Sequence, residues 1–138
     1  MEKTFAIFKP DCLEKNLVQT VLDYIFNQGL TIEKLKRIKA TPEQIKKHYH
    51  HIINEPFYDQ IEKYMTDGPI YIAILSGDNA INNWRYLMGT TNPRTAQPAS
   101  IRGRFGEVKN GCIYNVVHGS DSSENVKKEI EIWFGDNK

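Results

Sequence analysis

Apolar and polar positions along the chain follow two different periods, one typical of strands and one typical of helices. Residues 3–9, 30–39, 69–75 and 112–117 are short runs rich in apolar and β-favouring residues, and each is predicted to be a strand. The run at 30–39 carries one irregularity in its alternation. The run at 69–75 gives the strongest strand signal in the chain.

The first predicted helix follows the first strand. Its apolar residues fall at i, i+1, i+4, i+5 and i+8, on one face of a helix: Leu17, Val18, Val21, Leu22 and Ile25. We expect Asn16 to cap this helix, because its side chain can accept a hydrogen bond from a free backbone N–H. We expect Gly29 to end it.

Four further segments begin with residue types that start helices. These starts are Thr41-Pro42, Pro56, Asp78, and either Asp121 or Ser122. Gln44 completes a capping box with Thr41. Residues 89–111 show no periodicity and are predicted to be a long loop with short helical turns, a kind of segment that is often functional.

The order of elements is β-α-β-α-α-β-α-loop-β-α, which becomes βαββαβ when the extra helices are set aside. This order predicts an α+β, ferredoxin-like sandwich with a four-stranded antiparallel sheet and extra helices. With 138 residues, the chain is expected to form one domain over residues 1–138.

Composition and charge narrow the class of protein. Hydrophobic residues make up 40% and charged residues 25%, as in globular chains, and the net charge of +1 argues against a DNA-binding stripe or a polybasic membrane anchor. There is no apolar run of about 20 residues and no signal-peptide pattern at the start. Cys12 and Cys112 lack metal or redox spacing, so we expect a cytoplasmic protein with reduced thiols and no membrane contact.

His118 is the most informative candidate for chemistry. It leaves the end of a predicted strand just before Gly119 and the cap residues of the last helix. The positive end of that helix dipole would keep the imidazole neutral and nucleophilic and would stabilise a phosphoryl group on it. Glu129, on the same helix, could hold the other ring nitrogen. The competing interpretation is a partly buried structural histidine.

Basic side chains suggest an anion site. Lys9 ends the first predicted strand, and a group in and around the long loop can contact phosphate: Arg85, Thr91, Arg94, Arg102 and Arg104. Taken singly, each also fits a solvated surface side chain. Taken together, in a chain of nearly zero net charge, they favour a basic pocket.

Two other features have competing interpretations. His48 and His51 are spaced i, i+3 and could chelate a metal, but no third ligand type accompanies them, so a solvated helix face is favoured. Phe57, near the start of a helix, is either a core residue or a stacking surface for a flat ligand.

Together these pieces resemble the nucleoside diphosphate kinase family, from Thr4 to Phe134. Residues 115–122 are similar to the family's active-site signature around the histidine. Four other motifs occur along the chain in the family's order: Lys9-Pro10-Asp11, Thr91-Asn92-Pro93, Ile101-Arg102-Gly103 and the closing run Glu129 to Phe134.

The resemblance implies a ping-pong enzyme in which His118 takes the γ-phosphoryl group of a nucleoside triphosphate and passes it to a nucleoside diphosphate, with broad base tolerance. The residues that match the family's phosphate and ribose contacts are Lys9, Tyr49, Arg85, Thr91, Arg102 and Asn115. Among them, Lys9 and Asn115 would reach the sugar 3′-hydroxyl, and the arginines and Thr91 would serve the phosphates. Phe57 would stack on the base, and Ser120 and Glu129 would steady the His118 ring.

The resemblance also implies Mg²⁺ as cofactor, held by nucleotide and water with no direct protein ligand and with Asp121 helping at most through water. It further implies a homo-oligomer built from dimers. The chain departs from the family at Cys12, at Glu55, at Ala99-Ser100 and at Arg104, and residues 106–111 are slightly extended. These changes bear on nucleotide preference and assembly, not on the core chemistry.

Two alternatives belong to other functional classes. A ferredoxin-like sheet can also bind RNA, but that function needs paired exposed aromatic residues on the central strands, and the run at 112–117 offers only Tyr114. An inactive relative would be expected to lack His118, Lys9 or a phosphate contact, and the sequence retains all of them.

Overall fold

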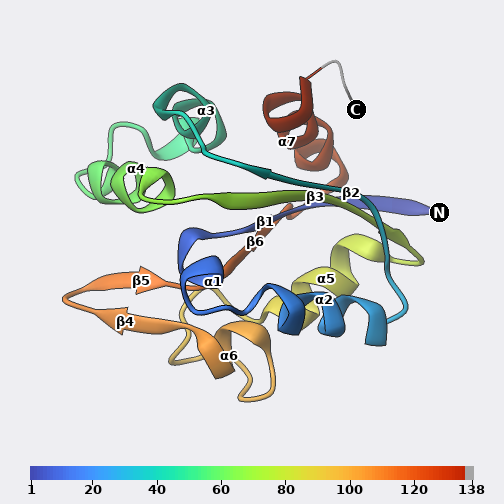
Figure 1. The fold of residues 1–138 in the computed structure, drawn as a ribbon. Coiled ribbons are helices and arrows are strands. Elements are labelled where there is room, and N and C mark those ends of the chain that lie inside the picture. The colour runs from blue at the N-terminus through green and yellow to red at the C-terminus, as the bar shows by residue number, and fades with distance from the viewer. Residues whose placement is uncertain (136–138) are drawn as a thin grey trace.

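The strand β1 (Glu2–Phe8) runs through the middle of a four-stranded antiparallel sheet of order β2-β3-β1-β6 (Figure 1). The structure is a computed structural model that describes residues 1–135. Strand β1 pairs with β3 (Ile70–Gly77) along its whole length and with the short edge strand β6 (Val117–Gly119) at its end. On the other edge, β2 (Thr31–Ile38) pairs with β3, with a register shift between Ile32 and Lys34 that confirms the predicted irregularity.

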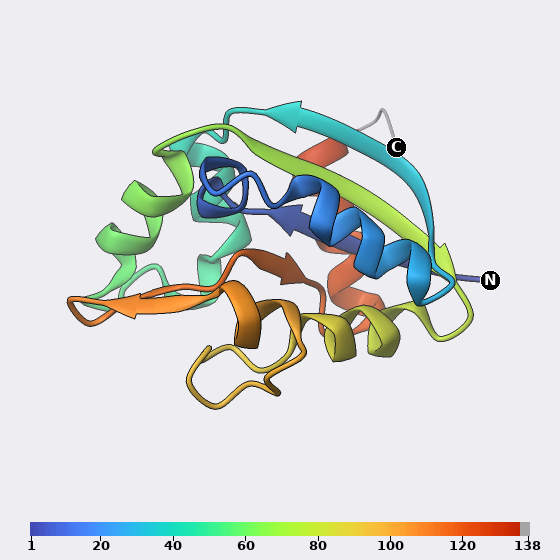
Figure 2. The same ribbon diagram turned by 60° about the horizontal axis from the view of Figure 1, so that its bottom comes forward.

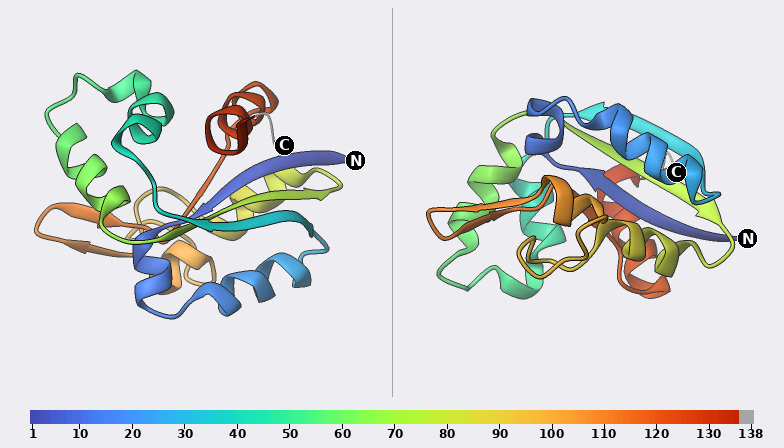
Figure 3. Two further views of the ribbon diagram at one scale, coloured as in Figure 1. Left: turned by 45° about the horizontal axis from the view of Figure 1, so that its top comes forward. Right: turned by 90° about the horizontal axis from the view of Figure 1, so that it is seen from below.

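Helices cover both faces of this sheet (Figures 1 and 3). One face carries α1 (Pro10–Glu14), α2 (Val18–Asn27), α5 (Ala80–Met88) and α6 (Ile101–Phe105). The other carries α3 (Pro42–His48), the 3₁₀ turn η1 (His50–Ile52), α4 (Tyr58–Thr66) and α7 (Ser123–Phe134). The ferredoxin-like sandwich with extra helices is thus confirmed. Among residues 1–135, no helix has the length and apolar character needed to cross a membrane.

The alternating side chains of β1 build two cores. Ala6 and Phe8 join a buried cluster with Trp84 on one face, and Phe5 and Ile7 join a second cluster with Trp133 on the other. This arrangement follows from the two-residue period of a strand, which sends successive side chains to opposite faces. Because both faces are covered, β1 is fully buried from residue 5 onward, which accounts for the nearly continuous apolar run in its sequence.

The helix ends agree with the sequence in part. Thr41 and Gln44 form the predicted capping box of α3, and Ser122 is the residue that caps α7, accepting from the Asn125 N–H. Gly29, with φ +83°, ends α2, where its own N–H donates to the carbonyl of Phe26.

Two predicted caps are wrong. Asn16 takes a left-handed conformation, φ +58°, in the turn before α2, and Leu17 occupies the cap position. Asp78 does not cap α5, which begins after Asn79, another left-handed residue. The free N–H of Ile81 in the first turn of α5 instead donates to the Glu2 carboxylate at 2.8 Å. The cap therefore comes from the far end of the sequence, where no local pattern reveals it.

The predicted fourth strand, residues 112–117, is wrong in its bounds. Cys112–Tyr114 forms β5, which pairs with β4 (Glu107–Lys109) in a separate hairpin, and the sheet strand β6 begins only at Val117. Asn110 and Gly111 connect β4 and β5, with φ of +52° and +78°. This is the two-residue turn that Asn-Gly favours between strands, so the signal was present in the sequence. Figure 2 shows the hairpin extending from the body of the molecule on the side of α4.

Candidate active site

A cavity of about 1150 Å³ opens beside β6 and the end of β1. Eight of the ten predicted site residues line it: Lys9, Tyr49, Arg85, Thr91, Arg102, Asn115, His118 and Glu129. These residues are spread over 120 positions of the sequence, from Lys9 to Glu129, and the fold brings their side chains to one cavity. Of the other two, Ser120 is buried next to the cavity wall, and Phe57 lines a neighbouring cavity.

His118 lies on β6 opposite Ile7 and is held through one ring nitrogen. Its Nε2 lies 2.9 Å from the Glu129 Oε1, and the Ser120 hydroxyl donates to the same oxygen at 2.6 Å. A carboxylate only accepts, so this contact places the ring proton on Nε2 and leaves Nδ1 with its lone pair. Burial, followed by the charges of Lys9 and Arg102, holds the pKa of His118 well below its ordinary value of 6.5. The ring is therefore a neutral base at physiological pH.

His48, which the sequence predicted to be solvent-exposed, is a buried neighbour of His118. The side chain is buried, and its Nδ1 accepts a hydrogen bond from the Trp133 indole N–H at 3.0 Å. Its ring centroid lies 4.4 Å from that of His118. The prediction that His48 belongs to a solvated helix face is wrong, whereas His51 is exposed as expected. Ile45, three positions earlier, is also buried, and this i, i+3 relation was the available signal.

Lys9 and Asn115 form a polar chain along the cavity wall. The Lys9 ammonium donates to the Asn115 Oδ1 at 2.7 Å, and the Asn115 amide donates to the Thr91 carbonyl at 3.1 Å. Burial, followed by the charge of Arg102, lowers the pKa of Lys9 to about 7. A phosphate or hydroxyl at this point of the cavity would meet donors that are already oriented.

Arg102 is buried and fixed by two backbone carbonyls. Its guanidinium donates to Gly89 at 3.1 Å and to Val117 at 2.7 Å, and its Nε is one of two buried side-chain polar atoms in residues 1–135 that have no partner. Burial lowers the pKa of Arg102 to about 10, so the group stays charged at neutral pH. Such a preorganised cation next to His118 suits an anion.

The other members of the predicted basic group do not all line the cavity. Arg85 lines the cavity from an exposed position, as does Thr91. Arg104 instead points to Tyr24, donating to its hydroxyl at 3.0 Å, and Arg94 is exposed and does not line the cavity. The five side chains are thus not a single cluster, and the three that line the cavity are Arg85, Thr91 and Arg102.

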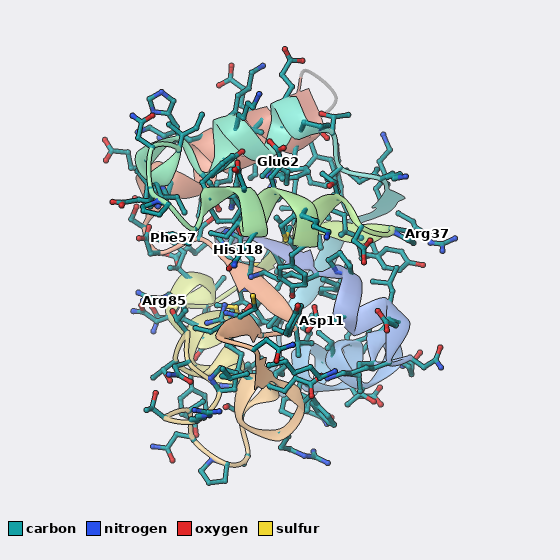
Figure 4. The ribbon with its side chains drawn as sticks, turned by 90° about the vertical axis from the view of Figure 1, so that its left-hand side faces the viewer. Asp11, Arg37, Phe57, Glu62, Arg85 and His118 are labelled. Carbon is teal, nitrogen blue, oxygen red and sulfur yellow. The ribbon has the colours of Figure 1, made fainter. Side chains whose placement is uncertain are left out.

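Phe57 marks a second cavity of about 370 Å³ that adjoins the first and shares Lys9, Tyr49, Thr91 and Asn115 with it. The Phe57 side chain is 47% exposed, so the alternative that it belongs to the core is wrong. The β4–β5 hairpin supplies the opposite wall through Ile113, which is also exposed. Figure 4 shows Phe57 and Arg85 on the side of the molecule where His118 lies.

A strained turn at Val116 lies between Asn115 and His118. The N–H of Val117 donates to the carbonyl of Asn115 at 2.7 Å across Val116, whose φ is +73°. This is a γ-turn of the rare kind, which is disfavoured for a β-branched residue. Val116 is fully buried, and its strain sits between Asn115 and His118, as strained residues often do at functional sites. The Val116 N–H in turn donates to the Asp11 carboxylate. Neither the turn nor Asp11 was predicted as part of the site.

The comparisons with known proteins agree with this geometry. A family model described as nucleoside diphosphate kinase matches residues 2–138. The chain belongs to the nucleoside diphosphate kinase family. Proteins named nucleoside diphosphate kinase in Streptococcus thermophilus and Streptococcus pneumoniae are 44% and 45% identical to the chain, covering 99% and 97% of it and all of their own length.

Solved structures of nucleoside diphosphate kinases share the fold. The enzyme from Encephalitozoon cuniculi superposes with a TM-score of 0.90 at 32% identity, covering 99% of this chain and 91% of its own. The enzyme from Halobacterium salinarum, solved with CDP, gives 0.91 at 30% identity, covering 99% and 89%. The activity is therefore that of the family, phosphoryl transfer from a nucleoside triphosphate to a nucleoside diphosphate.

Proposed function

We propose that His118 carries the phosphoryl group on Nδ1 in a ping-pong reaction. The observation that supports this most directly is the contact between Glu129 and Nε2, which leaves Nδ1 as the unprotonated ring nitrogen of a neutral imidazole. In the first half-reaction the Nδ1 lone pair forms a bond to the γ-phosphorus, and the bond from that phosphorus to the β,γ-bridging oxygen breaks. The nucleoside diphosphate leaves with the electron pair.

The second half-reaction reverses these steps with another nucleotide. A β-phosphate oxygen of the acceptor bonds to the phosphorus, the N–P bond breaks, and Nδ1 regains its lone pair. No proton needs to move in either direction, because Nδ1 carries none at the start and Nε2–H stays with Glu129 throughout. Glu129 also stabilises the positive charge that develops on the ring when Nδ1 is phosphorylated.

The other side chains bind and orient the nucleotide. Arg102, fixed by two carbonyls, and the exposed Arg85 and Thr91 contact phosphate oxygens. Lys9 and Asn115, joined at 2.7 Å, bind the sugar 3′-hydroxyl and the oxygens near it, with Tyr49 alongside. Phe57 stacks on the base in the smaller cavity. Since the stacking residue recognises an aromatic face, several bases are accepted.

Mg²⁺ fits this site as a partner of the nucleotide. Two carboxylates line the main cavity, and Glu129 is occupied by His118 and Ser120. The remaining one, Asp121, is exposed, and a hydrogen bond from Asn125 lowers its pKa, so it is ionised and able to contact a hydrated cation through water. When bound, the ion would neutralise charge on the phosphate oxygens.

We also propose a cytoplasmic homo-oligomer built from dimers. Cys12 and Cys112 are both free thiols, which is consistent with a reducing compartment. The assembly is supported by the family resemblance, and sedimentation at several protein concentrations would test it. A single monomeric species at micromolar concentration would contradict it.

The central test uses His118→Ala, with Arg104→Ala, an exposed side chain that lines neither cavity, as the control. Each protein is incubated with ATP labelled on the γ-phosphate, and label on the protein is measured after acid and after base. Wild type and Arg104→Ala should carry an acid-labile, base-stable label, and His118→Ala should carry none. Activity above about 1% in His118→Ala, a loss smaller than about 10²-fold, would overturn the covalent route.

A further inference from the structure

His48 contacts the His118 ring but lies outside the set of nucleotide contacts. It ends α3, and its ring meets His118 nearly at a right angle, at 76°, with the centroids 4.4 Å apart. Phe5 meets the same ring from β1 with its centroid at 6.3 Å. Together with the Glu129 contact, these neighbours pack around the His118 ring, and His48 and Glu129 also line the main cavity.

The hydrogen bond from Trp133 fixes the tautomer of His48. An indole N–H can only donate, so the Nδ1 that accepts from it carries no proton. Burial and the neighbouring His118 lower the pKa of His48 to about 3, which keeps the ring neutral. The single proton of this ring is therefore on Nε2. Trp133 is itself held in place, stacked on Phe5 at 18° with centroids 6.4 Å apart.

A charged His48 would disturb the active site. One ring nitrogen of His48, one of His118 and one carboxylate oxygen of Glu129 all lie within 4.8 Å of one another. An imidazolium at position 48 would attract the Glu129 carboxylate and weaken its contact with the His118 Nε2. Four groups affect the charge of His48: His118 on the edge strand β6, Lys9 just after β1, Glu129 on α7 and His51 on η1. Of these, only Glu129 favours the charged form. The titratable Tyr49 also contacts His48, with ring centroids 4.6 Å apart.

We propose that His48 is a positioning residue for His118. Its ring, kept neutral and in one tautomer by Trp133, holds the His118 imidazole in the orientation that points Nδ1 at the phosphoryl group and reserves Glu129 for Nε2. This inference rests on the proposed function, because it assigns a role relative to the nucleophile. It adds a pair of residues, His48 on α3 and Trp133 on α7, that acts through the orientation of His118.

The tautomer can be tested in the wild-type protein without any substitution. Long-range ¹H–¹⁵N correlation spectra of the imidazoles report which nitrogen carries the proton. We expect His48 to show a bare Nδ1 and a protonated Nε2 from pH 8 down to pH 5, with no titration in that range. A protonated Nδ1, or a titration near pH 6.5, would overturn the proposal.

The positioning role is tested by two substitutions that separate the ring from the acceptor. His48→Asn keeps an oxygen that can accept from Trp133 but removes the ring, whereas His48→Phe keeps a ring but leaves the indole N–H without its acceptor. We expect His48→Asn to slow phosphorylation of His118 in a single turnover by about tenfold, with KM for ATP within about twofold of wild type. His48→Phe should phosphorylate within about threefold of wild type at a lower melting temperature. Lys46→Asn, at an exposed position of α3 that lines neither cavity, is the control and should change neither.

A third variant, Trp133→Phe, tests the link between the indole and the His48 tautomer. It removes the donor to Nδ1 while burial still keeps the ring neutral, so the imidazole spectra of this variant should show both neutral tautomers of His48. A wild-type rate in His48→Asn, or a single unchanged His48 tautomer in Trp133→Phe, would overturn the positioning role. These outcomes differ from failure of the proposed function, in which His118→Ala itself would still be labelled.

Discussion

The carboxylate of Asp11 accepts the backbone N–H of Val116 at 3.1 Å, across a sequence separation of 105 positions. The other carboxylate oxygen accepts from the Tyr64 hydroxyl, and the Lys9 N–H donates to the Val116 carbonyl at 2.8 Å. Both backbone groups of the strained residue are thus held by the Lys9-Pro10-Asp11 segment. The first motif of the chain therefore supports the conformation of residues 115–118, from which Asn115 and His118 project.

Asp11→Asn should weaken this support. Both contacts of Asp11 come from donors, so the amide nitrogen of an asparagine would face one of them without an acceptor. We expect the free energy of unfolding to fall by roughly 1–3 kcal/mol and phosphorylation of His118 to slow. Urea unfolding and a single-turnover assay measure the two effects.

Tyr64→Phe is the matched control for Asp11→Asn, because it removes one of the two contacts and leaves the Val116 N–H paired. It should destabilise the protein less and leave the phosphorylation rate close to wild type. An equal loss of rate in both variants would show that the carboxylate does not act through Val116.

Arg102→Ala should lower kcat/KM for all nucleotides alike, since its proposed contacts are with phosphate oxygens and not with the base. The expected loss is about 2–4 kcal/mol, typical of a charge contact that strengthens in the transition state. Arg104→Ala, whose side chain contacts Tyr24 instead, is the control and should keep full activity. Because Arg102 also bonds two carbonyls, urea unfolding is needed to correct for the native fraction. A loss confined to one base would contradict the assignment.

Lys9 should make stability depend on pH. Its pKa is about 7 in the fold and has the ordinary value of 10.5 in the unfolded chain. Between these values the unfolded state binds more protons, so the free energy of unfolding rises as the pH rises from about 7. Urea unfolding between pH 7 and pH 8.5 should show this rise in wild type and a flatter profile in Lys9→Met. The same slope in both proteins would exclude Lys9 as its source.

Phe57→Ala should weaken binding of every nucleoside diphosphate by roughly 1–3 kcal/mol, because stacking does not depend on which base is present. We would measure kcat/KM for ADP, GDP, CDP, UDP and dTDP, with Phe26→Ala as a control. Phe26 is also exposed, but it lies on α2. Wild type should accept all five with preferences of about tenfold to a hundredfold. Rejection of four of the five by wild type would instead require a pocket that reads the base edge.

The sequence predicted those features that depend on neighbours along the chain. The first three strand runs, the capping box at Thr41 and Gln44, and the end of α2 at Gly29 were correct, since each is decided within a few residues. The two wrong caps failed for a different reason. Asn16 and Asn79 tolerate left-handed conformations, and each serves a turn instead of a helix start.

In the site, too, the sequence did not reveal contacts between residues far apart along the chain. The motifs identified the residues that line the cavity, because the resemblance carried them one by one. The supporting contacts, from Asp11 to Val116 and from Trp133 to His48, join residues 105 and 85 positions apart. A valine in a left-handed turn also contradicts its own local preference, so only the folded context can reveal it.

The bonds of Val117 have a consequence for the behaviour of the protein in solution. This residue starts the edge strand that carries His118, and exposed edges of sheets are templates on which other chains can pair. At Val117 the N–H is taken by Asn115 and the carbonyl by Arg102, so this step of the edge offers no free group to an incoming strand. The Arg102 guanidinium thus also closes this position of the sheet edge to pairing with another chain.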